Sequence, residues 1–526
     1  MIKYKQLILS LFFLYILIGC FLSIFNGISH DQYHEQLNWE KNFQAIKGFF
    51  FGLDNYNILN DYIDKYHGIA FHYLSQPFQF LFSNFVSNLN NTNEIGGIYI
   101  SRHIPNFIIF SISGIYFFLI CFKISSNNIF SLLSTILYLT YPYLFGHAQI
   151  NAKDIPFLSF WIMCTYYIFI IVGKINHSVK ILFKDILIIS FVTAFLISIR
   201  ISGSLIFLQY LIALIVITKI KKIKIYDLLT KNFSLILYFI FFTSFLIYIL
   251  SPIFWFNPLE IINSFDWMAK YYHDTCTLTL GECMRAQNLP SSYIFIWLFF
   301  KLPILIIFGI TIFPFIEKKI LNNNSSSIYY LIILFTILTL ILILILKDVA
   351  LYDELRHIMF LLPLIFILSL YNIYMFHRKI FYVLSILTII FFVFENFALK
   401  KYQYTWLNSL AKFTNIQKNF EVDYWGLSNK KLQEEVSVYS KKNNLPKNIC
   451  VYGDLYANVF LEKLGHKCFG NYSQIDSISE KPFFVYQNVR NLKRSKPKDC
   501  KLIKVEKYNY TFSTKDIITG KLWYCE

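Results

Sequence analysis

Charged and polar side chains interrupt the apolar segments of this sequence at a few separated places. The stretch "GHAQINAKDIPF" holds His147, Lys153 and Asp154, and "LYDELRHIMFLLP" holds Arg356 and His357. A carboxylate can accept the proton of an attacking hydroxyl group. An arginine or lysine can bind a phosphate and stabilise it as it leaves. These residue types therefore fit the displacement of a lipid-linked phosphate by a hydroxyl group.

Three further stretches place charges next to apolar segments. "SHDQYHEQLNWE" holds Asp31 and Glu35, "SIRISGS" holds Arg200, and "WLFFKLP" holds Lys301. A charge at the membrane boundary costs a few kcal/mol unless it is paired or hydrated, so such residues tend to mark a site. Each of them also has a simpler explanation. The cations could extend to lipid headgroups, and Asp154 could cap the helix that follows it.

The composition predicts a bundle of membrane helices. The chain has 526 residues, of which 56% are hydrophobic and only 15% are charged. Soluble domains have roughly 25% charged residues, whereas membrane spans exclude them. The net charge of +17 comes mostly from short loops and from the C-terminal tail. No basic stripe with interleaved aromatic residues stands out, which argues against a nucleic-acid partner.

About eleven apolar segments are long enough to cross a bilayer, which takes roughly 20 helical residues. They lie at 7–28, 104–122, 129–146, 156–173, 182–199, 203–218, 233–250, 293–316, 328–347, 357–375 and 380–397. By the positive-inside rule, the N-terminus and the short basic loops face the cytoplasm. Their cations are Lys3, Lys5, Lys123, Lys174, Lys180, Lys184, Lys219, Lys221, Lys222, Lys224, Lys318, Lys319, Arg378 and Lys379. We interpret 7–28 as a retained span, because it is longer than the apolar core of a signal peptide.

The larger polar segments, 29–103, 251–292 and 397–526, then lie outside the cytoplasm. We expect a membrane domain at 1–397, with outer loops at 29–103 and 251–292, and a small soluble domain at 398–526. In that domain "KKLQEEVSVYSKKN" and "LYANVFLEKLG" have helical patterns, and "NICVYGD" and "FFVYQN" are typical of buried strands. The tail contains no nucleotide-binding fingerprint and no nucleophile elbow.

Six of the nine cysteines fall in these outer segments. An even number of cysteines in an oxidising compartment suggests disulfides. One arrangement pairs Cys276 with Cys283, which closes a short loop, and pairs the four cysteines of the tail as Cys450–Cys468 and Cys500–Cys525. Buried free thiols are the alternative.

A polyprenyl-phosphate sugar would use acids and cations on the outer face together. Its lipid lies in the bilayer, its phosphate lies at the headgroup level, and its sugar projects outward. A carboxylate such as Asp31 would take the proton of the acceptor hydroxyl. Displacement at the anomeric carbon would then invert the configuration. No nucleotide is needed outside the cell, which agrees with the missing nucleotide motifs.

The same stretches resemble the GT-C superfamily of membrane glycosyltransferases, specifically glycosyltransferase family 39. Relatives of that family are the protein O-mannosyltransferases and the aminoarabinose transferases of lipid A. The matching features, in chain order, are "HDQYHE", "GHAQINAKDIPF", "SIRISG", "TLTLGECMRAQNLPSSYIFIWLFFKLP", "DELRHIMFLLP" and "FEVDYWGLS". The resemblance implies a polytopic α-helical membrane protein of the GT-C fold, with about 11 spans and a small C-terminal α/β extracytoplasmic domain.

The resemblance also implies roles for individual residues. Asp31 would be the catalytic base, and Asp154 would be a second acid that shapes the site or a metal site. The candidate contacts to the lipid phosphate or sugar are Glu35, Lys153, Arg200, Lys301, Arg356 and His357. Many family members have Asp-Glu in the first loop, whereas here Gln32 follows Asp31, and Glu35 shares a helical face with Asp31. Metal use varies across the superfamily, so the resemblance allows a divalent ion without predicting one.

We therefore predict a multi-pass protein of the bacterial inner membrane that transfers a sugar from a polyprenyl-phosphate donor to a lipid, glycan or protein acceptor. The alternatives are a secondary transporter or lipid flippase, a glycan ligase or polymerase, and an inactive family member with a binding role. Transporters tend to have inverted repeats and charges near the midplane. This sequence has no convincing repeat, and its charges gather at one face.

Overall fold

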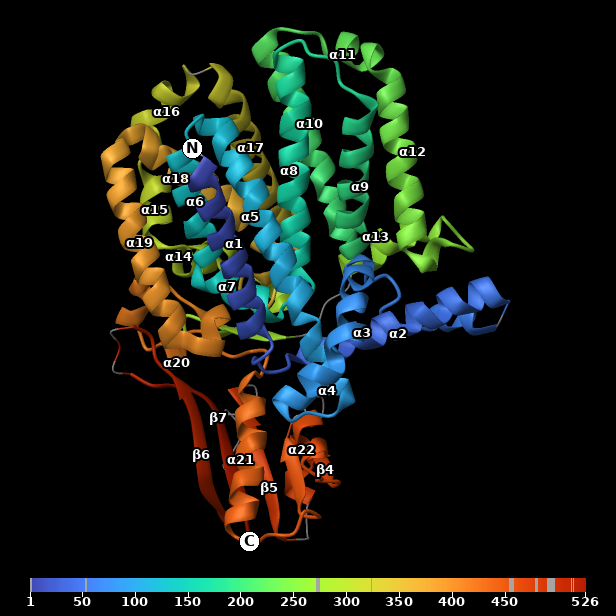
Figure 1. The fold of residues 1–526 in the computed structure, drawn as a ribbon, viewed down its shortest axis with the longest axis vertical. Coiled ribbons are helices and arrows are strands. Elements are labelled where there is room, and N and C mark those ends of the chain that lie inside the picture. Colours follow the sequence, from blue (N-terminus) through green and yellow to red (C-terminus); the bar gives the residue numbers. More distant parts are fainter. Residues whose placement is uncertain are drawn as a thin grey trace.

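The chain folds into a helical bundle with a small sheet domain at one end (Figure 1). The computed structural model describes residues 2–52, 54–270, 275–322, 324–453, 458–477, 481–489, 497–511, 513 and 515–526. The sheet domain extends from α21 (Ser428–Lys442) to the C-terminus. This arrangement confirms the predicted fold class, a largely helical membrane protein with a small C-terminal α/β domain.

Eight helices among the described residues are long and apolar enough to cross a membrane. They lie at Gln6–Ser23, Glu94–Ser125, Asp154–Asn176, Ile201–Lys221, Phe233–Leu250, Ser326–Leu346, Arg356–Phe376 and Arg378–Thr405. Two bent helix pairs raise the number to 10 if each pair is one span. A further helix, α9 (Phe183–Ile199), has 17 residues and lies at the predicted segment 182–199. Most of each predicted apolar segment therefore lies on a helix or on a bent helix pair, as expected of a multi-pass membrane protein.

The two bent pairs bring polar residues to one end of the bundle. The angle is 58° between α6 (Asn128–Thr140) and α7 (Pro142–Ile150), and 120° between α14 (Ser292–Lys301) and α15 (Ile304–Thr311). Pro142 begins α7 and Pro303 precedes α15, where proline interrupts the helical hydrogen bonds. The first pair leads into the turn before α8 (Asp154–Asn176), and the second leaves Lys301 at the end of α14.

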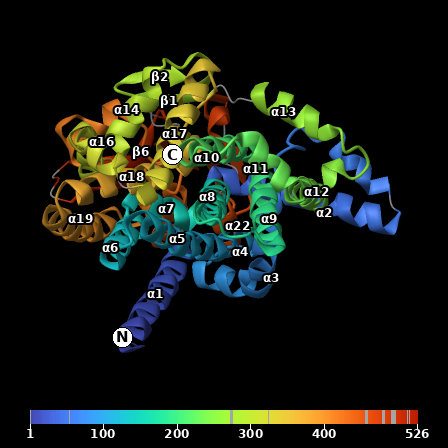
Figure 2. The same ribbon diagram turned by 90° about the horizontal axis from the view of Figure 1, so that it is seen from above.

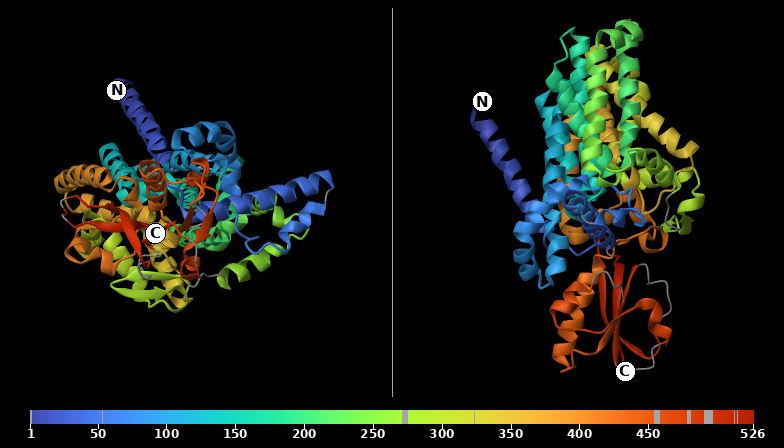
Figure 3. Two further views of the ribbon diagram at one scale, coloured as in Figure 1. Left: turned by 90° about the horizontal axis from the view of Figure 1, so that it is seen from below. Right: turned by 90° about the vertical axis from the view of Figure 1, so that its right-hand side faces the viewer.

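The first helix leans away from the bundle (Figures 2 and 3), and only 11% of its apolar window is buried, as expected of a helix that faces lipid. It ends at Ser23, five residues before the predicted end at 28, because the chain turns there toward α2. Gly27 lies in this turn, where an added Cβ would lie 2.7 Å from the carbonyl oxygen of Leu427. The bounds of this and the other bundle helices are α1 (Ile2–Ser23), α5 (His103–Ser125), α10 (Ile206–Lys221), α11 (Ile225–Lys231), α12 (Phe233–Leu250), α16 (Phe313–Leu321), α17 (Asn324–Leu346), α18 (Leu362–Phe376) and α19 (Arg378–Leu399). The short helix α20 (Ile416–Asn419) lies between the bundle and the sheet domain (Figure 1).

The end of the bundle that bears the sheet domain also carries the other polar outer elements (Figure 1). These are α2 (His30–Phe51), α3 (Ala70–Asn90), α4 (Glu94–Ser101), α13 (Glu260–Lys270) and the hairpin of β1 (Cys276–Thr279) and β2 (Glu282–Arg285). The N-terminus, α11 and α16 lie at the opposite end (Figure 1), and the basic clusters are in or beside these elements. The bundle thus separates the polar segments from the basic loops, as the positive-inside rule requires.

The sheet domain has five strands in the order β4-β3-β5-β7-β6. Their bounds are β3 (Cys450–Gly453), β4 (Phe469–Asn471), β5 (Phe483–Asn488), β6 (Cys500–Tyr508) and β7 (Ile517–Cys525). β3 pairs in parallel with β4 and β5, whereas β7 is antiparallel to β5 and β6. Leu432 and Val436 of α21 pack against Val451 and Phe484. The predicted helix "KKLQEEVSVYSKKN" and both predicted strands are present. α22 (Val459–Lys463) lies in "LYANVFLEKLG", of which residues 455–457 fall outside the described part.

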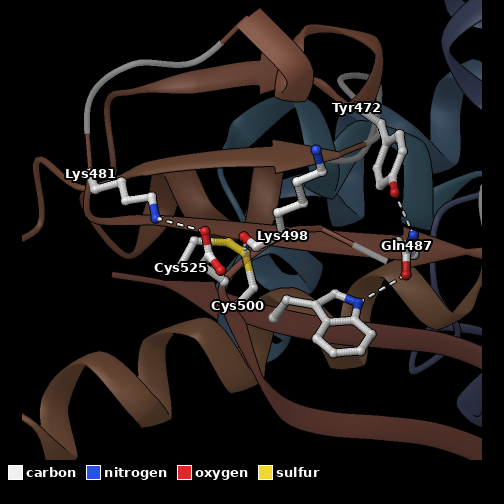
Figure 4. Close-up of a disulfide and its surroundings, with 8 residues drawn as sticks. Tyr472, Lys481, Gln487, Lys498, Cys500 and Cys525 are labelled. Atoms are coloured by element: carbon white, nitrogen blue, oxygen red, sulfur yellow. Dashed lines mark hydrogen bonds and ion pairs between the residues drawn. A yellow bond between two sulfur atoms is a disulfide. The ribbon is translucent and has the colours of Figure 1, made fainter. Parts of the chain in front are cut away.

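Three disulfides form, in the arrangement that the sequence suggested. They are Cys276–Cys283, Cys450–Cys468 and Cys500–Cys525. The last one joins the start of β6 to the end of β7 (Figure 4), where the two residues are register partners. Close to it, Gln487 accepts a hydrogen bond from Nε1 of Trp523 at 2.9 Å and donates one to the hydroxyl of Tyr472 (Figure 4). The disulfides therefore brace the hairpin and the sheet outside the bundle.

Residues 400–427 connect the sheet domain to the bundle. Tyr404, Trp406 and Trp425 of this segment are buried in the helical core. Glu395 of α19 is fully buried and accepts hydrogen bonds from the Lys412 ammonium at 2.9 Å and from the Thr511 amide at 3.1 Å. These contacts fix the sheet domain against the end of the bundle and hold Trp425 beside the charged residues described next.

Candidate active site

Arg356 joins three acidic residues that lie far apart in the sequence. It begins the 3-10 turn Arg356–Leu361 that leads into α18. Its Nη2 lies 3.0 Å from Oδ2 of Asp31, its Nη1 lies 3.2 Å from Oδ2 of Asp353, and its Nε lies 3.7 Å from Oδ2 of Asp154. The guanidinium presents five donors in fixed directions, so it can contact several carboxylates at once. The structure thus brings together charges that the sequence singled out separately.

Asp154 is held rigidly at the start of α8. Nδ2 of Asn151 donates a hydrogen bond to its Oδ2 at 2.8 Å, and Oδ1 of Asn151 accepts one from the Asp154 amide, also at 2.8 Å. Nη2 of Arg200 lies 2.6 Å from the other carboxylate oxygen of Asp154. Asn151 rather than Asp154 therefore binds the free amides at this helix start. The Asp154 carboxylate instead faces two arginines.

Asp31 is the accessible carboxylate of the three around Arg356. It lies in the first turn of α2, and 42% of its side chain is exposed. The side chains of Asp154 and Asp353 are only 3% and 4% exposed. A general base must be accessible to the hydroxyl group from which it takes the proton. Asp31 meets this condition.

Glu35 forms a second cluster one turn further along α2. Its Oε1 lies 3.4 Å from Nζ of Lys153, and its Oε2 lies 3.2 Å from Nε2 of His72. Lys153 also donates a hydrogen bond to the carbonyl of Gly68 at 2.8 Å. Burial acts to raise the pKa of Glu35, but Lys153 and His72 outweigh burial and hold that pKa well below its usual range. Burial lowers the pKa of His72 to about 4. The Glu35 carboxylate is therefore ionised at neutral pH and fixes the position of Lys153.

Lys301 and Glu354 form a fully buried ion pair. Nζ of Lys301 lies 2.6 Å from Oε2 of Glu354, and both side chains have 0% exposure. The ammonium group also lies 4.5 Å from the ring centre of Tyr143 and 5.6 Å from that of Trp297. The predicted contact of Lys301 with a lipid phosphate stays a prediction, because the structure gives this lysine a different partner. Removing either member of such a pair would leave an uncompensated buried charge.

The loop before Arg356 has an unusual backbone. Asp353 and Glu354 are consecutive residues with positive φ angles of 54° and 68°. Non-glycine residues rarely adopt this conformation, and surrounding contacts must hold them in it. The Asp353 amide donates to Oγ1 of Thr277 at 2.8 Å, and the Tyr293 hydroxyl donates to the Glu354 carbonyl at 3.3 Å. Contacts from the β1–β2 hairpin and α14 therefore shape the loop that presents Arg356.

Aromatic rings surround the guanidinium of Arg356. Its Cζ lies 5.4 Å from the ring centre of Tyr352 and 5.6 Å from that of Trp425. His357, predicted to bind substrate, packs edge to face against Tyr352 at 4.4 Å. His147 contacts Asn151 through Nδ1 at 3.1 Å and packs edge to face against Trp425 at 5.0 Å. His147 thus supports the residues that hold Asp154 and enclose Arg356.

Together the site holds five carboxylates and four cations, and each of them forms at least one ion pair within this set. The carboxylates are Asp31, Glu35, Asp154, Asp353 and Glu354, and the cations are Lys153, Arg200, Lys301 and Arg356. Within the described ranges, no group of three or more His, Cys, Asp or Glu residues is arranged to hold a metal ion. The chemistry that this arrangement can perform is proton acceptance at Asp31 and anion binding at the arginines.

A cleft lies beside the Lys153 and Arg200 side of this network. Its lining includes Gly68, which binds Lys153, and Ser198, two residues before Arg200. The rest of its wall is mixed, with apolar residues such as Ile197 and Ile247 and polar residues such as Asn42, Lys65 and His67. Its volume is about 20 Å³, which is room for about one water molecule.

Sequence reasoning gave no role to several residues of the site. Asn151 orients Asp154, His72 holds Glu35, and Tyr352 covers Arg356. The spacing of Asn151 and Asp154 is an N-cap pattern and could have identified Asn151. His72 lies in an ordinary helix, and no local pattern marks it. Asp353 and Glu354 stand in the quoted motif, but their partners depend on the tertiary fold.

No family model and no curated protein matches the sequence. The solved structures that match this chain include ArnT from Cupriavidus metallidurans in the apo state, with a TM-score of 0.49 and 9% identity over 99% of this chain and 98% of ArnT. The same ArnT bound to undecaprenyl phosphate has a TM-score of 0.43 and 10% identity over 98% and 97%. The apo oligosaccharyltransferase of Archaeoglobus fulgidus has a TM-score of 0.40 and 9% identity over 91% and 69%.

These TM-scores are below 0.5, so residue roles rest on the chain's own geometry.

Proposed function

We propose that this protein transfers a sugar from a polyprenyl-phosphate donor to an acceptor hydroxyl group, with inversion at the anomeric carbon. The observation that carries this proposal is the contact of Arg356 with both the exposed Asp31, at 3.0 Å, and the buried Asp154, at 3.7 Å. It joins a reachable base to a fixed anion-binding group at one end of a membrane bundle. A lipid-linked substrate in the bilayer would present its phosphate at this end of the bundle.

The proposed reaction moves one proton and breaks one bond. The Asp31 carboxylate accepts the proton of the acceptor hydroxyl as its oxygen attacks the anomeric carbon. The bond between that carbon and the phosphate oxygen breaks, and its electron pair leaves with the polyprenyl phosphate. The arginines stabilise the charge that grows on the departing phosphate. No oxidant, nucleotide or metal is needed for this balance.

Donor binding would change the contacts of Arg356. In the structure its Nη2 binds Asp31 at 3.0 Å. A phosphate oxygen is a strong acceptor for arginine, often in a bidentate arrangement. We propose that the phosphate takes over this nitrogen and releases the Asp31 carboxylate to accept a proton. The donor would thereby activate the base only when it is bound.

The buried residues of the network serve to position this centre. Arg200 at 2.6 Å and Asn151 at 2.8 Å hold Asp154, which in turn fixes Nε of Arg356. The Lys301–Glu354 pair stabilises the loop that precedes Arg356. Groups that are already oriented need not reorganise during the reaction. This preorganisation is a main source of the electrostatic stabilisation of the transition state by enzymes.

The site would face away from the cytoplasm. The basic loops lie at the other end of the bundle (Figure 1), and loops rich in lysine and arginine remain on the cytoplasmic side. Three disulfides in the outer elements support an oxidising compartment. A donor whose sugar has already been presented on the outer leaflet would meet the site directly.

Transfer of labelled hexose from a polyprenyl-phosphate donor, in membranes that contain the full chain, tests the proposal. We expect Asp31→Asn to lower transfer by about 10²-fold or more, since it removes the proton acceptor. Glu40→Gln is the matched control, because Glu40 is an exposed acid on the same helix whose carboxylate binds Gln36 at 3.0 Å. Normal transfer by Asp31→Asn would rule out the assigned base. Substrate movement across the membrane without a covalent product would instead favour a transporter.

A further inference from the structure

A second cleft opens beside the active site, between the segment before α14 and the end of α17. Its volume is about 280 Å³, near the lower end of ordinary ligand pockets, about 300–1,000 Å³. Gln287, Asn288 and Ser291 line one side of it, and Asp348 lies at its margin with α17. The cleft is therefore large enough for a small headgroup but not for a whole lipid.

The polar side of this cleft has the chemistry of a sugar site. Amide, hydroxyl and carboxylate groups together donate and accept hydrogen bonds, as neighbouring sugar hydroxyls require. Among the described residues that line the cleft, Asp348 is the only charged one, and none is lysine or arginine. A phosphorylated headgroup would lack a cationic partner here and would meet a carboxylate of its own sign.

The other side of the cleft is apolar. Leu344, Ile345 and Val349 line it at the end of α17. That helix contains Ser326–Leu346, one of the segments long and apolar enough to cross a membrane. A ligand in the cleft would thus have polar groups on one flank and the edge of the lipid phase on the other, which is the geometry of a glycolipid.

Two residues connect the cleft to the catalytic centre. Tyr293 lines the cleft, and its hydroxyl donates to the Glu354 carbonyl at 3.3 Å. Leu351 also lines it and is followed by Tyr352, which lies 5.4 Å from the Arg356 guanidinium. The cleft therefore adjoins the 351–354 loop that leads to Arg356.

We propose that this cleft is the acceptor subsite and binds the uncharged, polyhydroxylated headgroup of a glycolipid. This inference rests on the proposed glycosyl transfer and adds the chemical class of the acceptor. The hydroxyl that attacks belongs to a sugar, not to a phosphate or a protein side chain. The donor phosphate binds at Arg356, and the acceptor headgroup binds in the cleft with its attacking hydroxyl at the edge that adjoins the 351–354 loop.

Photo-crosslinking of the full chain in lipid nanodiscs tests this subsite without requiring turnover. The probes are an octyl β-glucoside that carries a diazirine next to the sugar and the 6-phosphate of the same glucoside. We expect the neutral probe to label peptides from 286–294 or 344–351, and to do so about fivefold more strongly than the phosphorylated probe. Asn288→Leu should lower neutral labelling about fivefold. Lys347→Gln, an exposed neighbour outside the lining, is the control and should leave labelling unchanged.

The selectivity has its own test. Asp348→Asn removes the negative charge, so it should raise labelling by the phosphorylated probe about fivefold while neutral labelling stays within twofold. Crosslinks that map elsewhere, or a phosphorylated probe that labels the wild-type cleft as well as the neutral one, would overturn the inference. Failure of the proposed function is separate, because it would appear as absent sugar transfer even where the neutral probe labels the cleft.

Discussion

Replacing Arg356 by lysine keeps a positive charge in the site but removes the guanidinium geometry. In the structure three different nitrogens of Arg356 contact Asp31, Asp353 and Asp154, at 3.0, 3.2 and 3.7 Å. A lysine ammonium is a single point on a flexible chain and can take the place of only one of these nitrogens. We therefore expect Arg356→Lys to bind the donor phosphate weakly and to leave the acids out of position.

The expected size of this effect follows from the role of Arg356. Removing one preorganised group that stabilises developing charge costs about 2.7–4 kcal/mol, which is about 10²–10³-fold in rate. The substituted lysine retains part of the attraction to phosphate, so we expect the lower value, about 100-fold in kcat/KM. Folding should survive, because Asp154 keeps its contacts with Arg200 at 2.6 Å and with Asn151 at 2.8 Å.

The assay is initial-rate transfer from a labelled polyprenyl-phosphate hexose, with the protein amount and the apparent melting temperature measured in parallel. Arg378→Lys is the matched control, since Arg378 is exposed at the start of α19 and lies at the basic end of the bundle. Its transfer rate should remain within twofold of wild type. Transfer by Arg356→Lys within threefold of wild type, with normal folding, would refute the role assigned to the guanidinium.

Three further predictions concern stability. His72 titrates near 6.5 when unfolded but has a folded pKa of about 4, so the unfolded state binds the proton first as the pH falls. Stability should drop by about 2 kcal/mol between pH 8 and pH 5, and this drop should be smaller in His72→Asn when melting is measured across that range. Lys301→Met or Glu354→Leu alone should each lower the free energy of unfolding by about 3–5 kcal/mol. The double variant should have a melting temperature closer to that of wild type, because it removes both buried charges. A double variant less stable than both single variants would contradict the assignment of these residues as a buried ion pair. Replacing Cys276 and Cys283 by serine should lower the free energy of unfolding by about 2 kcal/mol. It should also slow sugar transfer, because the hairpin that these cysteines close binds the loop at 353–354. Unchanged transfer would show that the hairpin does not position the catalytic residues.

Much of the architecture could be predicted from hydropathy and from the charge of the loops. The membrane spans could be located because each one needs a continuous run of apolar residues. The clustering of Asp31, Asp154, Arg200 and Arg356 at one end followed from the same topology, since all of them were expected at outer ends of spans. In the C-terminal tail, the strands at 450–453 and 483–488 could be predicted because each contains a short run of apolar and aromatic residues.

Tertiary pairing within the site could not be derived in the same way. Charged residues at one membrane face can combine in many ways, and only the fold decides that Lys301 binds Glu354 while Arg356 binds three aspartates. The positive φ angles at 353 and 354 have no local signal, because neither residue is glycine. The edge strand β6 carries several lysines, and Thr519, Gly520 and Lys521 interrupt the apolar residues of β7, so neither pattern was clear enough to predict a strand.

A structure of the full chain with a polyprenyl phosphate bound tests the central claim most directly. We predict that the phosphate oxygens lie within about 3 Å of the Arg356 guanidinium and that the Asp31 carboxylate no longer contacts Nη2 but faces the donor's sugar position. A phosphate bound at the basic end of the bundle, or one that leaves the Asp31–Arg356 contact of 3.0 Å intact, would contradict the account.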